Sequence, residues 1–168
     1  MVCVGEKWEI GKNNELLFRI PEDLKRFKAI TEGKNVVMGR KTLESLPNSN
    51  PLPNRNNFVI TRNKDFSQRD VVGVNSISQF LAIANTMEEL GSEVYVIGGG
   101  EIYKKLLPKC NTVLVTKVYK KIKDADTYFP NLDKSKEWEI IEESEIHNEG
   151  GLEYQFVKYE RIEETQTA

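Results

Sequence analysis

The 168-residue sequence contains one histidine, His147, and two cysteines, Cys3 and Cys110. A single histidine excludes the usual histidine-based metal cages and argues against a Ser-His-Asp triad. The cysteines lie far apart and lack a Cys-x-x-Cys spacing, so neither a zinc site nor a disulfide framework is indicated. We therefore expect no metal, and we expect the cytoplasm, because this sparse cysteine usage is typical of a reducing compartment.

Long hydrophobic runs and an excess of one charge are also missing. No apolar run approaches a membrane span, and Glu6 and Lys7 interrupt the first apolar residues, so no signal peptide is expected. The 24 basic and 26 acidic residues leave a net charge of −2. This balance indicates neither a nucleic-acid nor a membrane partner. We expect one domain over residues 1–168, with a frayed polar tail at 163–168.

The stretch Val94–Pro108 joins a short β-branched run, three consecutive glycines and a helical pattern. Its first four residues predict a buried strand, and Ile102 and Leu106 recur at helical spacing. A helix that begins at bare backbone presents unpaired N–H groups, where a pyrophosphate can bind. Glycine serves a tight turn equally well, and three glycines in a row are not the spaced dinucleotide fingerprint. These residues alone leave both interpretations open.

A second strand-to-helix junction follows Asn35–Gly39, where Arg40, Lys41 and Thr42 open a short helix. Two cations and a hydroxyl suit a phosphate, although a solvated turn is the simpler interpretation of this junction alone. Together with Gly98–Gly100, three further strand ends carry candidate site groups: Gly39–Thr42, Thr61-Arg62 and Thr116. Ligands of open α/β sheets gather at such carboxyl ends, so one crevice is predicted.

The order of elements predicts an α/β fold. A mixed, mostly parallel central sheet is covered by helices on both faces and ends in an antiparallel hairpin. The predicted strands are 1–4, 35–39, 57–61, 71–74, 94–97, 112–118, 138–144 and 152–161. The predicted helices are 21–31, 40–46 and 78–90, the last capped by Ser78 with Leu90 inward. Residues 5–19 and 47–55 are predicted as loops.

Asp23 lies on the apolar stripe of the helix that Pro21 opens, with Phe27 and Ile30. A carboxylate on such a stripe is desolvated, which raises its pKa and suits it to proton chemistry. The alternative is an acid that stabilises the first turn of the helix. Arg55, on the proline-containing loop, reads by itself as a solvent-facing cation.

Five motifs in order resemble the signature of bacterial dihydrofolate reductase. They are Ile20-Pro-Glu-Asp-Leu-Lys-Arg-Phe-Lys, Val37-Met-Gly-Arg-Lys-Thr-Leu-Glu-Ser-Leu, Pro51-Leu-Pro-Asn-Arg, Val96-Ile-Gly-Gly-Gly-Glu-Ile-Tyr and Asp126-Thr-Tyr-Phe-Pro. The match spans nearly the whole chain. It implies a dihydrofolate reductase-like fold and NADPH-dependent reduction of 7,8-dihydrofolate to tetrahydrofolate, in support of one-carbon metabolism. Hydride would pass from nicotinamide C4 to pterin C6, and a proton would reach N5.

The resemblance also assigns catalytic and substrate residues. Asp23 would bind the pterin amino group and promote protonation at N5, and Thr116 would support that carboxylate. Arg55 would bind the α-carboxylate of the substrate's glutamate, for which a bidentate guanidinium is well suited. The full set of implied substrate contacts is Cys3, Leu24, Phe27, Leu46, Leu52, Arg55, Ile97 and Tyr103.

NADPH is the implied cofactor, and a monomer is expected. Arg40, Lys41 and Arg62 would surround the 2′-phosphate and so favour NADPH over NADH. A cis peptide would join Gly98 and Gly99, and a mobile loop from Ile10 to Leu16 would close on the nicotinamide. The implied cofactor contacts are Ile10, Asn14, Leu16, Gly39, Arg40, Lys41, Thr42, Thr61, Arg62, Gly98, Gly99, Gly100, Glu101, Ile102, Tyr103 and Thr127.

Several positions depart from the family pattern. The first strand is shorter than is usual, Cys3 stands in place of an alanine, and Phe18 stands in place of a tryptophan. Gly5 and Glu9 are atypical as well. These departures concern the first strand and the loop after it.

Two alternative functions share the predicted fold. One is the related reductase of riboflavin synthesis, against which Asp23 and Arg55 argue. The other is a nucleotide-binding module that has lost activity through its shortened first strand. Turnover of dihydrofolate with NADPH separates all three.

Overall fold

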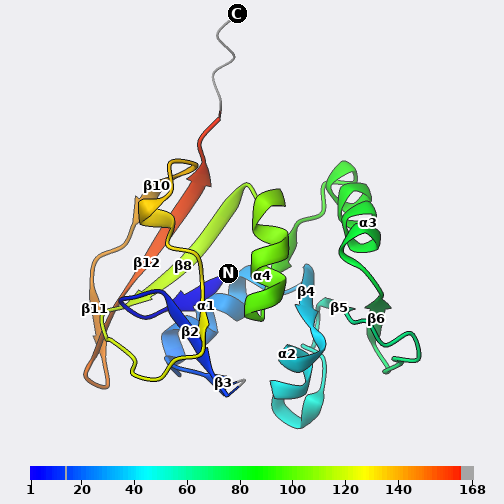
Figure 1. Cartoon of the computed structure of the whole chain (residues 1–168), viewed down its shortest axis with the longest axis horizontal. Coiled ribbons are helices and arrows are strands. Elements are labelled where there is room, and N and C mark those ends of the chain that lie inside the picture. The colour runs from blue at the N-terminus through cyan, green and yellow to red at the C-terminus, as the bar shows by residue number, and fades with distance from the viewer. Residues whose placement is uncertain (14, 164–168) are drawn as a thin grey trace, which may run out of the picture. The chain divides into compact units, whose positions relative to one another are not determined.

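The structure is a computed structural model that describes residues 1–13 and 15–163. The chain, drawn in Figure 1, forms two compact units. Unit 1 comprises residues 1–18 and 107–168, and unit 2 comprises residues 19–106. Residues 164–168 of the tail predicted at 163–168, and the predicted cofactor contact Asn14, lie outside the described residues.

Unit 2 contains a parallel four-stranded sheet with the order β6-β5-β4-β7. Its strands are β4 (Asn35–Gly39), β5 (Asn56–Ile60), β6 (Val71–Val74) and β7 (Val94–Val96). Strand β4 is central, and its first four residues are buried, as expected for a parallel strand covered on both faces. Strand β7 differs from the prediction, because all three of its residues are only partly buried.

Helices cover both faces of this sheet, as predicted. Val37 faces a cluster that includes Phe80 of α3 (Ile77–Glu89) and Ile102 of α4 (Gly100–Leu106). Val36 and Met38 face the opposite cluster, which includes Leu43 of α2 (Arg40–Ser45). Successive residues of a strand point to opposite faces, so one short apolar run supplies both cores.

Two helix starts show local sequence control. Helix α1 (Pro21–Thr31) begins at Pro21, which is favoured in the first turn because its ring presets φ. Helix α3 begins one residue after Ser76, whose side chain accepts a hydrogen bond from Gln79 N at 3.1 Å. The prediction of Ser78 as the cap is therefore wrong. Leu90 is also not inward: it follows the helix and is 80% exposed.

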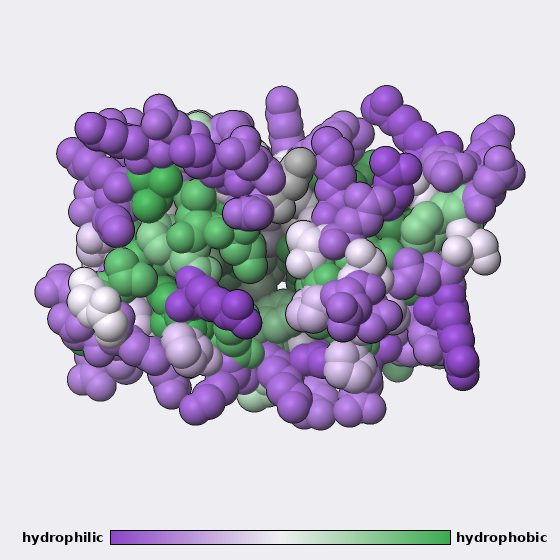
Figure 2. Space-filling view, turned by 90° about the horizontal axis from the view of Figure 1, so that it is seen from below, coloured by the Kyte–Doolittle hydropathy of each residue, from purple (hydrophilic) through white to green (hydrophobic). Residues whose placement is uncertain are grey.

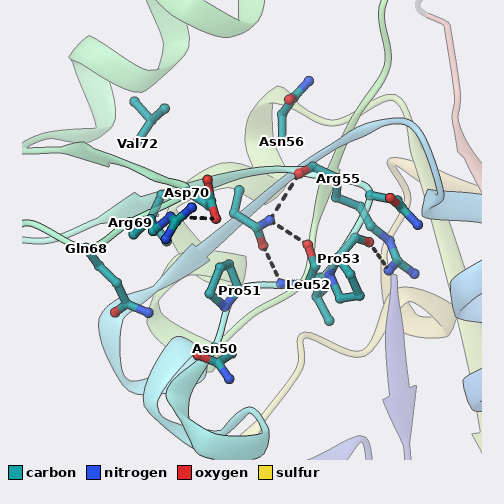
Figure 3. A pocket seen from close by; sticks show the side chains of 13 residues that line it. Asn50, Pro51, Leu52, Pro53, Arg55, Asn56, Gln68, Arg69, Asp70 and Val72 are labelled. Carbon is teal, nitrogen blue, oxygen red and sulfur yellow. Dashed lines mark hydrogen bonds and ion pairs between the residues drawn. The ribbon is translucent and has the colours of Figure 1, made fainter.

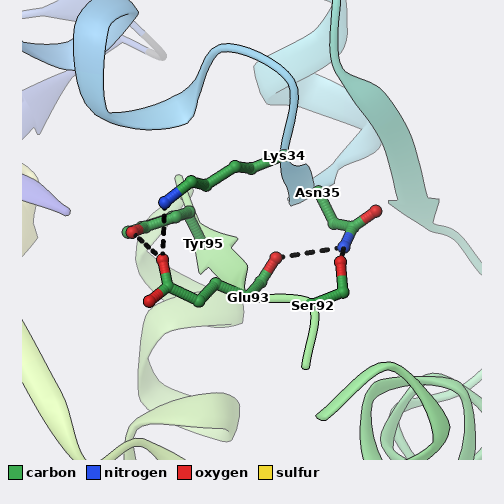
Figure 4. A network of polar contacts seen from close by, with 5 residues as sticks. All are labelled: Lys34, Asn35, Ser92, Glu93 and Tyr95. Carbon is green, nitrogen blue, oxygen red and sulfur yellow. Dashed lines mark hydrogen bonds and ion pairs between the residues drawn. The ribbon is translucent and has the colours of Figure 1, made fainter. Parts of the chain in front are cut away.

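At the amino ends of β4 and β7, a polar network joins neighbouring chain segments (Figure 4). Asn35 Nδ2 donates to Ser92 Oγ at 2.7 Å and to the Glu93 carbonyl at 3.0 Å. Lys34 Nζ and the Tyr95 hydroxyl both contact Glu93 Oε2, at 2.9 and 2.5 Å. Asn35 is only 2% exposed, so these partners satisfy a buried amide.

Unit 1 contains a mixed five-stranded sheet with β8 (Thr112–Val118) near its middle. Strand β1 (Val2–Val4) runs parallel to β8, and β12 (Leu152–Arg161) runs antiparallel to it (Figure 1). Strands β10 (Trp138–Glu143) and β11 (His147–Glu149) pair with β12. The predicted terminal hairpin is therefore confirmed, with its turn at Gly150 and Gly151.

The segment 5–19 is not a plain loop. It contains β2 (Glu9–Lys12) and β3 (Glu15–Leu16), which pair with each other. Strand β2 also pairs with β9 (Thr127–Tyr128), which gives a small three-stranded sheet. This pairing depends on a strand far along the chain, so the polar local sequence does not reveal it. Short 3₁₀ helices complete the chain at Pro47–Ser49, Leu107–Lys109 and Leu132–Lys134.

An aromatic cluster lies in unit 1. Trp8 stacks on Phe129 with ring centroids 6.1 Å apart, and Tyr159 meets the Trp8 ring edge-on at 6.1 Å. Lys117 Nζ lies 5.5 Å from the centroids of Trp8 and Tyr159 and forms an ion pair with Asp133 at 2.7 Å. The Tyr159 hydroxyl also donates to Asp133, at 2.6 Å. This cluster therefore contains a carboxylate that accepts two hydrogen bonds, although its side chain is 42% exposed.

Most of the face drawn in Figure 2 is hydrophilic, with hydrophobic residues gathered in restricted areas. Over residues 1–13 and 15–163, no helix combines the length and the apolar character that crossing a membrane requires.

Candidate functional site

The carboxyl ends of β4 and β7 meet at bare backbone in unit 2. Ile97 N donates to the Val37 carbonyl at 3.0 Å, and Gly39 N donates to the Gly98 carbonyl at 2.9 Å. The peptide bond between Gly98 and Gly99 is cis, which confirms that expectation. Two of the predicted strand ends therefore come together as the sequence indicates.

Glycine is required at these ends because side chains of α4 approach the backbone closely. A Cβ added at Gly98 would lie 3.2 Å from the Tyr103 ring, and Gly98 has a φ of +116°. A Cβ at Gly39 would lie 3.2 Å from Ile102 Cγ1. Both contacts are tighter than ordinary van der Waals distances, so larger residues would push α4 away.

The hydroxyl of Thr42 also borders the glycine turn. A Cβ added at Gly99 would lie 3.6 Å from Thr42 Oγ1, so α2 and the glycine backbone are neighbours. Thr61 continues the same edge after β5: it is 8% exposed, and its backbone N donates to Val74 at 2.9 Å. Backbone groups and hydroxyls thus gather where a phosphate-bearing ligand needs them.

Cations surround the first turn of α4. The pKa of Glu101 is lowered, first by its hydrogen bond from Lys105 and then by the charges of Arg62 and Lys41. Arg62 and Lys41 follow different strands, yet both act on this one carboxylate. Arg40 is engaged elsewhere, because its Nε lies 3.3 Å from Glu44 Oε1. Of the three predicted phosphate partners, two therefore act electrostatically on a carboxylate in the first turn of α4.

Arg55 is not the solvent-facing cation that its loop position suggested. Its Nε donates to Thr31 Oγ1 at 3.2 Å, and its Nη1 donates to the Pro53 carbonyl at 2.6 Å (Figure 3). Thr31 is fully buried and donates in turn to the Phe27 carbonyl at 2.8 Å. The guanidinium is therefore oriented by the last turn of α1 and by the proline loop.

Most of the other substrate residues predicted in unit 2 form two groups, one on α1 and one packed against the sheet. Asp23 and Phe27 are half-buried on α1, whereas Leu24 is 44% exposed. Leu46, Leu52 and Ile97 pack on one buried cluster of the sheet, the one that contains Val36 and Leu43. The structure thus brings three predicted pterin-binding side chains onto one face.

The predicted site residues of unit 1 lie on five strands: β1, β2, β3, β8 and β9. Cys3 of β1 is the register partner of Thr116 of β8, so these side chains are neighbours, and Thr116 is 3% exposed. Ile10 is half-buried on β2, and Leu16 is 79% exposed on β3. Thr127 is the partner of Gly11 in β2, and its Oγ1 donates to Asp126 Oδ1 at 2.8 Å.

A pocket of about 750 Å³ opens beside the proline loop (Figure 3). It is lined by residues 50–57 and 68–72 and therefore lies at the amino ends of β5 and β6. Leu52 and Arg55 belong to it, whereas the glycine turn follows the carboxyl ends of the strands. The pocket is thus separate from the proposed phosphate contacts.

Three buried polar residues were not identified from the sequence: Glu9, Thr31 and Asn57. Each is at most 2% exposed. Thr31 forms a hydrogen bond with Arg55, and Asn57 forms one with Leu52; Arg55 and Leu52 are predicted site residues. Glu9 accepts a hydrogen bond from Ile122 N, in the segment before β9. Only the folded chain brings these partners together, so no local pattern marks them. In the described part of the chain, no group of three or more His, Cys, Asp and Glu side chains could hold a metal ion.

Comparisons with known proteins identify the family of this chain. A family model described as "Dihydrofolate reductase" matches residues 1–161. The dihydrofolate reductase of Bacillus subtilis is 36% identical over 154 residues, which cover 90% of this chain and 87% of that protein. The enzyme of Neisseria gonorrhoeae is 37% identical over 160 residues, which cover 95% of this chain and 94% of that protein.

A solved structure gives the same result. The dihydrofolate reductase of Enterococcus faecalis, described as complexed with NADP(H) and RAB-propyl, superimposes with a TM-score of 0.84 at 29% identity. The alignment covers 96% of this chain and 94% of that protein. The chain belongs to the dihydrofolate reductase family.

Proposed function

We propose that this protein reduces 7,8-dihydrofolate to tetrahydrofolate with the residues described above. Membership of the family makes the chain an NADPH-dependent oxidoreductase. The observation that best supports the assignment of its cofactor contacts lies in unit 2. There, Gly39 and Gly98 share a hydrogen bond of 2.9 Å at the strand ends, beside a turn on which Arg62 and Lys41 act.

The cofactor side of the site uses backbone, hydroxyl and cationic groups. The backbone from Gly98 to Ile102, with Thr42, is suited to a pyrophosphate, because glycine leaves its N–H groups accessible. Arg62 and Lys41 are exposed cations that would neutralise a 2′-phosphate, and Arg40 would join them by leaving Glu44. NADH offers no such phosphate, so these charges favour NADPH.

The substrate side uses α1 and the proline loop. Leu46, Leu52 and Ile97 supply an apolar wall, since they share one cluster on the sheet. Arg55 is pre-oriented by Thr31 and by the Pro53 carbonyl, which leaves part of its fork for a carboxylate. We assign it to the α-carboxylate of the glutamate tail.

Proton transfer is assigned to Asp23. Its carboxylate is half-buried in the first turn of α1, a setting that suits a group that promotes protonation at N5. Thr116 keeps the supporting role that the family resemblance implies. When bound, NADPH supplies the hydride to pterin C6. The hairpin of β2 and β3 carries Ile10 and Leu16, to which we assign the exclusion of water from the nicotinamide.

Turnover tests the proposal directly. Purified protein mixed with NADPH and dihydrofolate should consume both, seen as a fall in nicotinamide absorbance, with tetrahydrofolate formed in equal amount. NADPH binding without turnover would instead support a nucleotide-binding module. Reduction of a ribosylaminopyrimidine in place of dihydrofolate would indicate the related reductase of riboflavin synthesis.

We further propose that residues 1–168 act as one functional domain, as a monomer in the cytoplasm. A single family model matches residues 1–161, which supports one functional domain. Light scattering of the purified protein should return the mass of one chain, 19.3 kDa.

A further inference from the structure

The buried side chain of Asn57 is bonded entirely to the turn that carries Leu52 and Arg55. Leu52 N donates to Asn57 Oδ1 at 3.0 Å, and Asn57 Nδ2 donates to the Leu52 carbonyl at 2.9 Å. The same Nδ2 donates to the Arg55 carbonyl at 3.2 Å. Asn57 is 2% exposed, so these backbone groups are its partners in place of water.

These bonds fix a part of the turn that no other contact described above reaches. The guanidinium of Arg55 is held by Thr31 and Pro53, but neither of them bonds to Leu52. The Asn57 side chain forms hydrogen bonds with both the N–H and the carbonyl of Leu52, as a residue of a neighbouring β-strand would. It therefore helps to determine how the turn enters β5.

We infer that Asn57 is a positioning residue for the substrate. Its amide holds the backbone from Leu52 to Arg55, so that the Leu52 side chain and the Arg55 guanidinium both face the substrate. The inference rests on the proposed role of Arg55 in binding the glutamate carboxylate. Asn57 acts through the turn and does not itself touch the substrate.

The effect of Asn57 should be confined to the substrate. Its bonds lie at the start of β5, whereas Thr61 and Arg62 of the cofactor side follow the end of that strand. A change at Asn57 should therefore alter recognition of the glutamate tail and leave NADPH binding intact.

The test compares Asn57→Asp and Asn57→Ser with the unmodified protein. A carboxylate at this position would face two carbonyl oxygens that now accept from Nδ2, and a serine side chain is too short for the reciprocal pair. The readout is kcat/KM for dihydrofolate divided by kcat/KM for dihydropteroate, which lacks the glutamate. We expect this ratio to fall about tenfold, the size of one lost charge-assisted hydrogen bond, with KM rising more than kcat falls.

Asn35→Asp is the matched control. Asn35 is also a 2% exposed asparagine on the neighbouring strand, but its Nδ2 donates to Ser92 and Glu93 (Figure 4). Its Oδ1 accepts from Asn56 Nδ2 at 2.9 Å, and an aspartate at position 35 keeps an oxygen for this bond. General damage to a buried amide would change the ratio in both proteins, whereas positioning changes it only at Asn57. In an Arg55→Ala background, which itself lowers the ratio, Asn57→Asp should cause no further fall.

Each remaining outcome is decisive. An unchanged ratio in both Asn57 variants overturns the inference, while a lowered ratio in Arg55→Ala alone leaves the proposed function standing. If Arg55→Ala also leaves the ratio unchanged, the assignment of the glutamate contact fails. Loss of NADPH binding in both Asn57 variants overturns the inference as well, because a positioning residue leaves the cofactor side intact.

Discussion

Asp23 and Glu22 are adjacent acids in the first turn of α1 with different surroundings. Asp23 is half-buried, whereas Glu22 is exposed and lies 3.6 Å from Lys25 Nζ. We predict that Asp23→Asn lowers hydride transfer at neutral pH by about a hundredfold or more, the usual size of lost acid–base catalysis. NADPH affinity should persist. Stopped-flow measurement of NADPH oxidation gives the rate of hydride transfer, and titration of cofactor fluorescence gives the NADPH affinity.

Glu22→Gln is the control for this change, because it removes a charge from the same turn without altering the half-buried position. Its rate should match that of the unmodified protein. Normal rates in Asp23→Asn would remove Asp23 from the mechanism.

Arg62 is an exposed cation that helps to lower the pKa of Glu101. We predict that Arg62→Ala weakens NADPH binding about tenfold and NADH binding much less, since only NADPH carries a 2′-phosphate. Titration of cofactor fluorescence gives both dissociation constants. Lys64→Ala removes an exposed cation two residues further along and should change neither. Equal weakening of the two cofactors by Arg62→Ala would show that Arg62 does not face the 2′-phosphate.

Among the elements, the hairpin of β2 and β3 is anchored by a buried acid. Glu9 is 1% exposed, and its carboxylate accepts from Lys7 N at 2.5 Å and from Ile122 N at 2.6 Å. A Cβ added at Gly5 would lie 2.9 Å from this carboxylate, so the glycine makes room for it. Gly5 and Glu9, two of the residues that depart from the family pattern, are thus parts of one arrangement.

We predict that Glu9→Gln lowers the free energy of unfolding by about 3 kcal/mol. The glutamine amide has one oxygen that can accept a hydrogen bond, and its NH₂ group would face the other backbone N–H donor. Urea denaturation followed by tryptophan fluorescence measures this loss. Glu6→Gln, at an exposed neighbour, should stay within about 0.5 kcal/mol of the parent. A loss at Glu9 no larger than that at Glu6 would contradict the anchoring role.

For the molecule as a whole, Asp133 contributes to stability against acid. Burial acts to raise the pKa of its carboxyl, but hydrogen bonds from Lys117 and Tyr159 outweigh burial and bring the pKa below its ordinary value of 3.8. A lowered pKa stabilises the folded state above that ordinary value, and the stabilisation is lost as the pH falls through the folded-state pKa.

Unfolding followed by urea titration between pH 6 and pH 2 tests this pH dependence. Asp133→Asn should be less stable than the parent near pH 6, and the difference should shrink as the solution becomes acidic. Asp65→Asn, at an exposed aspartate, should follow the parent at every pH. A constant difference between Asp133→Asn and the parent would refute the prediction.

Local patterns predicted the regular elements well. Helix α1 has its predicted bounds because Pro21 marks its start, and β4 and β8 follow runs of β-branched residues. The glycine turn was also recognised, and its need for glycine is explained by the approach of α4.

Errors arose where distant partners or competing local signals decide the outcome. The hairpin of β2 depends on β9, which lies far along the chain. Ser76 and Ser78 both suit a helix cap, and only the structure selects the first. Thr31 and Asn57 become important because folding places Arg55 and Leu52 beside them.

The pairing of β1 with β8 has a consequence for synthesis on the ribosome. Residues 2–4 emerge first, yet their hydrogen-bonding partners at 112–118 appear only after all of unit 2 has been translated. The nascent chain can therefore complete its parallel four-stranded sheet before β1 can pair with β8. The mixed sheet is complete only when β12 has left the exit tunnel.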